Sequence, residues 1–119
     1  MQYDNRSPIY LQVIDRIIKR MVIGEILPGE KMPSTRVLAV EYEVNPNTAA
    51  RIYKEMETMG LCYTERGLGT FMTEDKNVVN RLRHELADKM TQEFVREMSS
   101  LGFTVQEMKE AIEEEIKLC

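Results

Sequence analysis

The sequence has no tryptophan, one histidine and two cysteines among its 119 residues. Cys62 and Cys119 lie far apart, so we expect neither a disulfide framework nor a paired metal-ligand motif. His84 has no cysteine or histidine close to it in the sequence, which argues against a zinc site. No apolar run approaches the roughly 20 residues that a membrane-spanning helix needs, so none is expected.

The groups that catalysis and targeting require are also missing. The N-terminus lacks the basic segment and apolar segment of a signal peptide, so we expect a cytoplasmic protein with reduced thiols. No nucleophile and histidine form a set, no glycine-rich phosphate loop occurs, and no carboxylate pair suggests an acid–base site. We therefore expect a protein that is not an enzyme and that holds no metal and no cofactor.

A basic excess is absent as well. The formal net charge is -4, whereas proteins that bind DNA often carry more cations than anions. Residues 1–74 contain nine Lys/Arg and ten Asp/Glu, and residues 75–119 contain seven and ten. The acidity therefore lies mainly in the last third, and a DNA-binding face in the first part would depend on local clustering of cations.

What the sequence does contain is strong helical periodicity, first in residues 8–22. Apolar residues recur three or four positions apart there, with charged residues on the opposite face. Ser7 and Pro8 predict the start of this helix, Ser7 as its cap and Pro8 as its first residue. In the connector 25–33, Pro28-Gly29 is typical of a type II turn, and Lys31-Met32 suits a very short strand.

Two short helices are predicted next. Ser34 caps one that runs to about Glu43, and Asn45-Pro46 starts another that runs to Met59. Gly60 ends the second helix. Because only a tight turn separates the two helices, they form a helix-turn-helix.

Residues 61–73 change from helical to strand character. Two runs rich in β-branched and aromatic residues flank Gly67-Leu68-Gly69, which predicts a β-hairpin with a glycine-dependent tip. A hairpin in this place after a helix-turn-helix is a wing.

The last third is predicted to be a helical hairpin. An apolar stripe runs for about six turns until Gly102, and Thr104 with Glu107 forms a capping-box signature for a final helix. Two helices with one stripe each cannot enclose a core, so we expect these apolar side chains to form a dimer interface. The predicted interface residues are Leu82, Leu86, Met90, Phe94, Met98, Val105, Met108, Ile112 and Ile116.

The predicted fold is therefore mainly α with a small β-hairpin. A winged helix-turn-helix occupies residues 1–74, and a two-helix hairpin for dimerisation occupies residues 75–119. Residues 8–72 resemble the DNA-binding domain of the GntR family of bacterial regulators, with matches that stay in register over about sixty residues. Those matches include Pro8-Ile9-Tyr10-Leu11-Gln12, Pro28-Gly29-Glu30-Lys31-Met32-Pro33-Ser34-Thr35-Arg36, Val44-Asn45-Pro46-Asn47-Thr48 and Arg66-Gly67-Leu68-Gly69-Thr70-Phe71. The short tail resembles that of the YtrA subfamily.

The resemblance and the chemistry of the side chains together predict a DNA-binding set. Amide, hydroxyl and guanidinium groups at the start of a recognition helix read base edges or bond phosphates. The set comprises Ser34, Arg36, Asn45, Asn47, Thr48, Arg51, Lys54, Arg66, Gly67 and Gly69. Each position also has a simpler explanation, such as helix capping for Asn45, a salt bridge to Glu55 or Glu57 for Arg51 and Lys54, and turn formation for the glycines.

The expected function is that of a DNA-binding transcription regulator, in particular a repressor that binds an inverted-repeat operator as a homodimer. Many members of the family have arginine where this chain has Pro46, so the base preference of the family does not transfer. A winged helix that contacts another protein is the alternative, and it predicts no salt-dependent DNA binding. The sequence indicates no particular effector.

Overall fold

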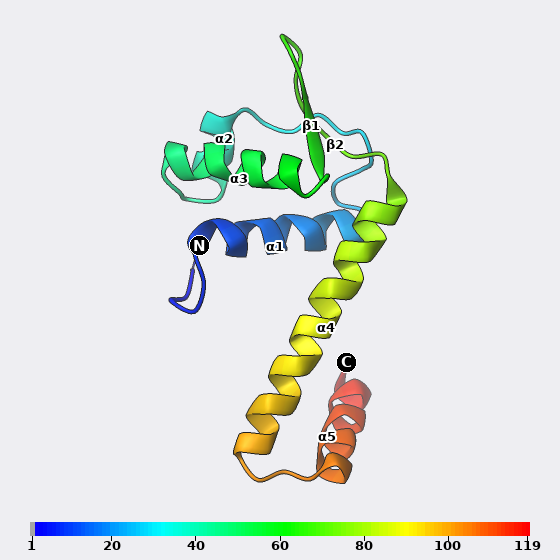
Figure 1. Ribbon diagram of the computed structural model, residues 1–119. Helices are drawn as coiled ribbons and strands as arrows, with labels where there is room; N and C mark the ends of the chain where they lie inside the picture. The colour runs from blue at the N-terminus through cyan, green and yellow to red at the C-terminus, as the bar shows by residue number, and fades with distance from the viewer. Residues whose placement is uncertain (1) are drawn as a thin grey trace. The chain divides into compact units, whose positions relative to one another are not determined.

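The computed structural model describes residues 2–119, in which five helices and one two-stranded antiparallel sheet follow one another (Figure 1). This order confirms the mainly helical fold with a hairpin. The chain divides into two compact units, one up to Arg83 and one from His84 to Cys119. Among residues 2–119, no helix combines the length and the apolar character that crossing a bilayer requires.

Helix α1 spans Ile9–Val22 and begins differently from the prediction. Pro8 occupies the N-cap position in an extended conformation, and no side chain caps the helix. Ser7 therefore lies one residue too early for its hydroxyl to reach the free N–H groups of the first turn. The Gln12 amide instead donates to the carbonyl oxygens of Asp4 at 2.9 Å and of Ser7 at 2.8 Å, which fixes the segment before the helix.

Helices α2, Thr35–Glu41, and α3, Pro46–Thr58, form the helix-turn-helix. The predicted caps are confirmed, because Ser34 Oγ accepts from the Val37 N–H and Asn45 Oδ1 accepts from the Asn47 N–H. Helix α2 ends two residues before the predicted Glu43. Glu43 instead adopts a left-handed conformation with φ of 54°, in which the chain reverses between the two helices.

The core of the first unit lies where α1, α2 and α3 meet the base of the hairpin. Side chains from all these elements are almost completely removed from solvent, which is the largest stabilising contribution to a small fold. They include Val13, Ile14, Ile17, Ile18, Leu38, Ala49, Ile52, Met56, Leu61 and Met72. Because four residues of α3 are buried, namely Ala49, Ile52, Tyr53 and Met56, the opposite face of α3 is held toward solvent.

Strands β1, Cys62–Glu65, and β2, Gly69–Met72, form the predicted hairpin with Cys62 opposite Met72 and Glu65 opposite Gly69. The connector before α2 joins this sheet through an isolated bridge between Lys31 and Phe71. The Met32 N–H donates to the Thr70 carbonyl at 2.7 Å, and the Met72 N–H donates to the Glu30 carbonyl at 2.9 Å. The short strand predicted at Lys31-Met32 is thus a single bridge that ties the wing to the connector.

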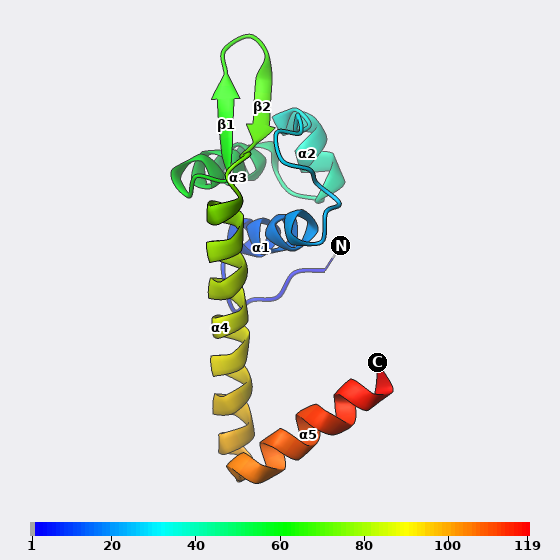
Figure 2. The ribbon, with the colours of Figure 1, turned by 90° about the vertical axis from the view of Figure 1, so that its right-hand side faces the viewer.

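The second unit consists of the later turns of α4, which spans Lys76–Ser100, and of α5, Val105–Leu118. The capping box is confirmed, with Thr104 Oγ accepting from the Glu107 N–H and Glu107 Oε1 accepting from the Thr104 N–H. The two helices spread apart from the turn that connects them (Figure 2). In residues 84–119 only Met108 is fully buried.

Candidate nucleic-acid interface

The start of α3 presents amide and hydroxyl groups at the surface. Asn45 and Asn47 are exposed, and Thr48 is half-buried. The side-chain oxygen of Asn45 accepts the cap bond from the Asn47 N–H at 2.8 Å, which leaves the NH₂ group of Asn45 free to donate. Capping and contact with a ligand are therefore compatible at Asn45, because they use different atoms of the side chain.

The start of α2 contributes a hydroxyl and a cation. Ser34 accepts the Val37 N–H at 3.3 Å through the same oxygen that can still donate its own proton. Arg36 follows in the first turn with its side chain exposed. The position is unfavourable for a cation with respect to the helix dipole, so local helix stability does not explain the arginine.

Arg51 and Lys54 lie on the exposed face of α3 and differ in their contacts. The guanidinium carbon of Arg51 lies 3.9 Å from the centre of the Tyr10 ring, and its Nη2 donates to the Tyr10 hydroxyl at 3.1 Å. The salt bridges to Glu55 or Glu57 that the sequence allowed do not form. The Glu57 carboxylate instead accepts a hydrogen bond from the Thr64 hydroxyl of the wing.

The wing tip needs both of its glycines. Gly67 and Gly69 have φ of 81° and 125°, which confirms the glycine-dependent tip. A Cβ on Gly67 would meet nothing within 4 Å, so the need there is purely conformational. A Cβ on Gly69 would lie 2.9 Å from Cε of Lys31, so this glycine also gives room to a lysine side chain. Arg66 and Leu68 are exposed beside them.

Lys31 is a cation of this surface that the sequence did not indicate. Its bridge to Phe71 places it beside Gly69, and a hollow of about 550 Å³ lies between the wing and the start of α2. Lys31, Ser34, Thr35, Leu68 and Thr70 are among the residues that line the hollow. No local pattern could reveal this arrangement, because the pairing joins segments about forty residues apart in the chain.

The charges of this surface are largely uncompensated. In residues 2–119, none of Lys31, Arg36, Arg51, Lys54 and Arg66 forms an ion pair with an acidic side chain. Arg20, by contrast, pairs with Glu25 at 3.3 Å and with Glu41 at 3.1 Å. The surface thus offers local positive charge within a unit whose overall charge is close to neutral.

Burial affects two titratable side chains in the core of this unit, Cys62 and Tyr53. Burial, with a smaller effect from the Glu57 charge, raises the pKa of the Cys62 thiol to about 12. Burial also raises the pKa of Tyr53, whose hydroxyl donates to the Pro33 carbonyl. A thiol that stays protonated near neutral pH is a poor nucleophile, so Cys62 acts in packing.

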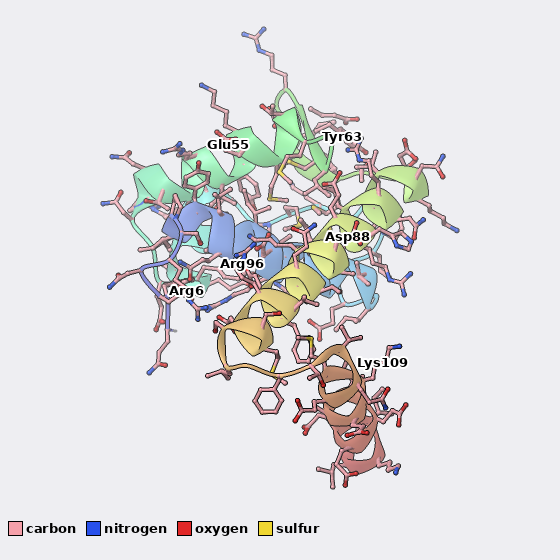
Figure 3. The ribbon with its side chains drawn as sticks, turned by 60° about the horizontal axis from the view of Figure 1, so that its bottom comes forward. Arg6, Glu55, Tyr63, Asp88, Arg96 and Lys109 are labelled. Atoms are coloured by element: carbon pink, nitrogen blue, oxygen red, sulfur yellow. The ribbon has the colours of Figure 1, made fainter. Side chains whose placement is uncertain are left out.

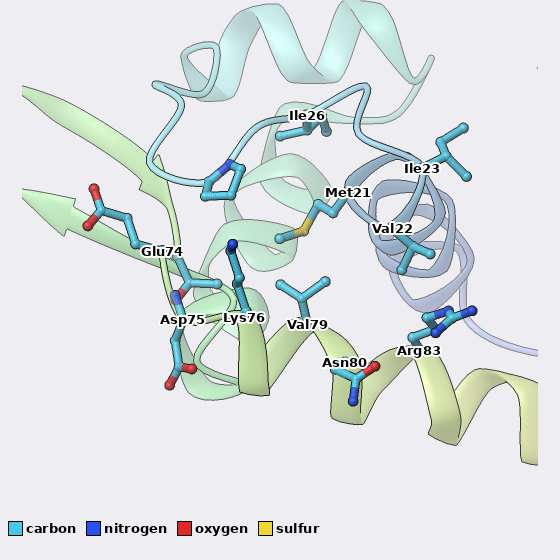
Figure 4. Close-up of a pocket in the computed structure, with 12 residues that line it drawn as sticks. Met21, Val22, Ile23, Ile26, Glu74, Asp75, Lys76, Val79, Asn80 and Arg83 are labelled. Atoms are coloured by element: carbon cyan, nitrogen blue, oxygen red, sulfur yellow. The ribbon is translucent and has the colours of Figure 1, made fainter.

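A second cavity, of about 560 Å³, lies between the end of α1 and the first two turns of α4 (Figure 4). Lys76 and Val79 point toward Met21 inside it, whereas the side chains of Glu74 and Asp75 point away. None of the predicted DNA-binding residues lines this cavity.

The predicted interface residues of the tail fall into two groups. Leu82 and Met108 are 6% and 7% exposed, so both are already packed within one protomer. The side chains of Met90, Val105, Ile112 and Ile116 are exposed, and those of Leu86, Phe94 and Met98 are half-buried. Val95, Leu101 and Phe103 are exposed apolar residues that the prediction did not include. Charged side chains such as Asp88, Arg96 and Lys109 extend from the same helices (Figure 3).

A three-helix core that carries a helix-turn-helix and a glycine-tipped wing defines the winged helix class of DNA-binding proteins. The sequence model of the family described as bacterial regulatory proteins, gntR family, matches residues 9–72 of this chain. This chain therefore belongs to the GntR family, and it is a DNA-binding transcription regulator, not an enzyme.

Relatives of similar length support this assignment. The chain is 45% identical over 111 residues to the uncharacterized HTH-type transcriptional regulator YhcF of Bacillus subtilis, covering 93% of this chain and 92% of YhcF. It is 43% identical over 77 residues to the HTH-type transcriptional repressor YtrA of Bacillus subtilis, covering 63% of this chain and 59% of YtrA.

Solved structures agree as well. A GntR family transcriptional regulator from Listeria monocytogenes superimposes with a TM-score of 0.84 and 37% identity, over 94% of this chain and 98% of the other. The DNA-binding domain of AraR in complex with operator ORX1 has a TM-score of 0.54 and 28% identity, over 61% of this chain and 93% of the other.

Proposed function

We propose that this regulator is a repressor that binds an inverted-repeat operator as a homodimer in the cytoplasm. The observation that carries the proposal is the group of exposed polar side chains at the start of α3, on a helix whose opposite face is fixed by Ala49, Ile52 and Met56 in the core. A rigid helix with free amide groups at its N-terminal end suits the major groove, where base edges offer matching donors and acceptors.

Within this proposal the side chains have separate tasks. Asn45, Asn47 and Thr48 discriminate between bases, and Arg51 and Lys54 neutralise phosphates and release counterions. Arg36 contacts both a phosphate and a base edge. The Ser34 hydroxyl donates a hydrogen bond to the DNA backbone beside Arg36. Lys31, which lies beside Gly69, and Arg66, which precedes Gly67 in the chain, add positive charge to the wing, where Gly67 and Gly69 allow the backbone to approach the DNA closely.

Dimerisation is supported by the exposed apolar side chains of the second unit. Val105 and Ile116 are 66% and 65% exposed on one face of α5, and Phe103 and Val95 add to the apolar surface. Two diverging helices with one buried side chain bury little apolar surface by themselves. A second copy would stabilise them, because it would remove the exposed apolar side chains from water. Two-fold symmetry then presents two recognition helices to two half-sites.

Repression is supported by the similarity to YtrA of Bacillus subtilis, which is a transcriptional repressor. A homodimer on an operator represses when it occupies DNA that the transcription machinery needs.

The decisive experiment is selection of bound duplexes from a random pool by the full-length protein. We expect enrichment of a sequence with two inverted half-sites, and binding that weakens steeply as the salt concentration rises. Enrichment of a single half-site would contradict the dimeric mode, and the absence of any enriched or salt-sensitive duplex would contradict DNA binding and favour a protein partner. Repression requires a reporter gene behind the selected site, and higher expression with the regulator present would reverse that part of the proposal.

Individual contacts are tested on the selected duplex. Arg36→Ala should weaken binding by about 1–3 kcal/mol if a base contact is lost. Lys19→Ala is the matched control, because it removes one charge from an exposed position of α1 outside the proposed surface. Equal affinities of the two variants would remove Arg36 from the interface.

A further inference from the structure

We propose that Tyr10 is a positioning residue, which holds the Arg51 guanidinium in place for a phosphate of the DNA backbone. This inference rests on the proposed function. Two contacts carry it, both between side chains that are 41 positions apart in the sequence. The guanidinium carbon lies 3.9 Å from the centre of the Tyr10 ring, and Arg51 Nη2 donates to the Tyr10 hydroxyl at 3.1 Å.

The Tyr10 side chain is well placed to act as a fixed support. It is half-buried in the first turn of α1, and the next turns of this helix bury Val13 and Ile14 completely in the core. The Gln12 amide fastens the preceding segment to the same turn through the Asp4 and Ser7 carbonyls. A ring attached to such a helix has little freedom, so a guanidinium that stacks on it is also restricted.

The Arg51 guanidinium keeps most of its binding capacity in this arrangement. Of its five N–H donors, the contact with the Tyr10 hydroxyl uses one. Within residues 2–119 no carboxylate pairs with it, so its charge is not neutralised. The remaining donors form a planar fork, which suits two oxygens of one phosphate.

Restriction before binding improves affinity. A free arginine side chain loses considerable rotamer freedom when it is immobilised on a ligand. Tyr10 has already restricted Arg51 in the unbound protein, so less entropy is lost on contact with DNA. The Tyr10–Arg51 pair would thus contribute to DNA binding although the tyrosine itself carries no charge.

The test uses full-length protein and a labelled duplex that the wild-type protein has selected from a random pool. Arg51→Ala should weaken binding and reduce the salt dependence of log K by about one phosphate per protomer. Tyr10→Leu should weaken binding about two- to fivefold per protomer, the equivalent of a cation–π contact. It should also lower the salt dependence, although it removes no charge, because an Arg51 side chain that the ring no longer holds neutralises the phosphate in only part of the complexes. A merely structural role for Tyr10 would leave that slope unchanged.

Further variants guard against a folding defect. Tyr10→Phe keeps the ring and should retain most of the affinity. The double variant Tyr10→Leu/Arg51→Ala should bind no more weakly than Arg51→Ala alone. Tyr3→Leu is a control for the loss of a stack that does not involve Arg51, because the Tyr3 ring lies 4.5 Å from the Arg16 guanidinium carbon; this variant also loses the hydrogen bond from the Tyr3 hydroxyl to the Tyr42 carbonyl.

Several results would overturn the proposal while DNA binding itself stands. These are additive effects in the double variant, tighter binding by Tyr10→Leu, or an unchanged salt slope in that variant. If the wild-type protein selects no duplex at all, the proposed function fails and the role of Tyr10 fails with it.

Discussion

The two units of this protein differ in how much of their apolar surface they bury. In the first unit, side chains from three helices and the base of the wing meet in one core, and Ile52 and Met56 of α3 are completely inaccessible. In residues 84–119 two amphipathic helices diverge, and only Met108 is fully buried (Figure 2). The first unit therefore has a core of its own, whereas the second leaves most of its apolar side chains exposed.

This difference shows how a small regulator can separate two tasks. The core of the first unit fixes the orientation of α3, so the polar face of this helix always points toward solvent. The second unit leaves the apolar side chains of Val105, Ile112 and Ile116 exposed within the protomer. In the proposed homodimer, two copies of this chain would present two recognition helices to the DNA.

The largest effect is expected from a charge in the second unit. Ile116→Asp places a carboxylate in the proposed interface, and two-fold symmetry repeats it in the partner. We expect monomers on a sizing column at micromolar concentration and at least about tenfold weaker binding to the selected duplex. Gln92→Asp is the control, since it introduces the same charge on the polar face of α4. If Ile116→Asp stays dimeric, the exposed apolar face of α5 is not the dimer interface, and the difference in burial between the two units has no bearing on dimerisation.

The next effect concerns the core of the first unit. Ile52→Ala removes buried volume from α3 and should lower the free energy of unfolding by about 2–5 kcal/mol. Ile116→Ala shortens a side chain that is 65% exposed in the protomer. Its effect on unfolding should depend on protein concentration if the residue lies in a dimer interface. Urea unfolding at two protein concentrations measures both variants, and a concentration-independent loss for Ile116→Ala would argue for packing within the protomer.

A smaller effect is expected at the wing tip. Gly69→Ala forces an alanine to φ of about 125° and displaces Lys31, so it should cost about 1–2 kcal/mol of stability. It should also weaken DNA binding. Gly67→Asn is the comparison, because asparagine tolerates the left-handed conformation there and its Cβ would meet no atom within 4 Å. Thermal unfolding measures the stability of the two variants, and a gel shift measures their affinity for DNA. If both variants have the same stability and the same affinity, Lys31 has no role in DNA binding.

The smallest effect is a pH dependence that belongs to the first unit. The pKa of Cys62 is raised from about 9 to about 12, so the unfolded chain releases this proton first. The stabilisation is fully present below pH 9 and is lost as the pH rises toward 12. Cys62→Ala should therefore lose less stability between pH 8 and pH 10.5 than the wild-type protein. Cys119→Ala, which removes an exposed thiol, should leave the wild-type profile unchanged.

The sequence predicted well the features that depend on a few adjacent residues. The caps at Ser34, Asn45 and Thr104 use side chains that bond N–H groups two or three residues away. The positive φ values at Gly67 and Gly69 follow from the same kind of local requirement. At Ser7 the local signal was misleading, because proline itself took the cap position and left the serine outside the first turn.

By itself, therefore, the sequence determined the order of the helices, the helix-turn-helix, the wing and the amphipathic character of the tail. Periodicity and capping are short-range properties, so they can be followed along the chain. Only the tertiary structure decided that Lys31 lies against Gly69, that Arg51 stacks on Tyr10, and that Leu82 and Met108 are buried within the protomer. These arrangements join segments distant in the chain or depend on which face of a helix another element covers, and no local pattern contains that information.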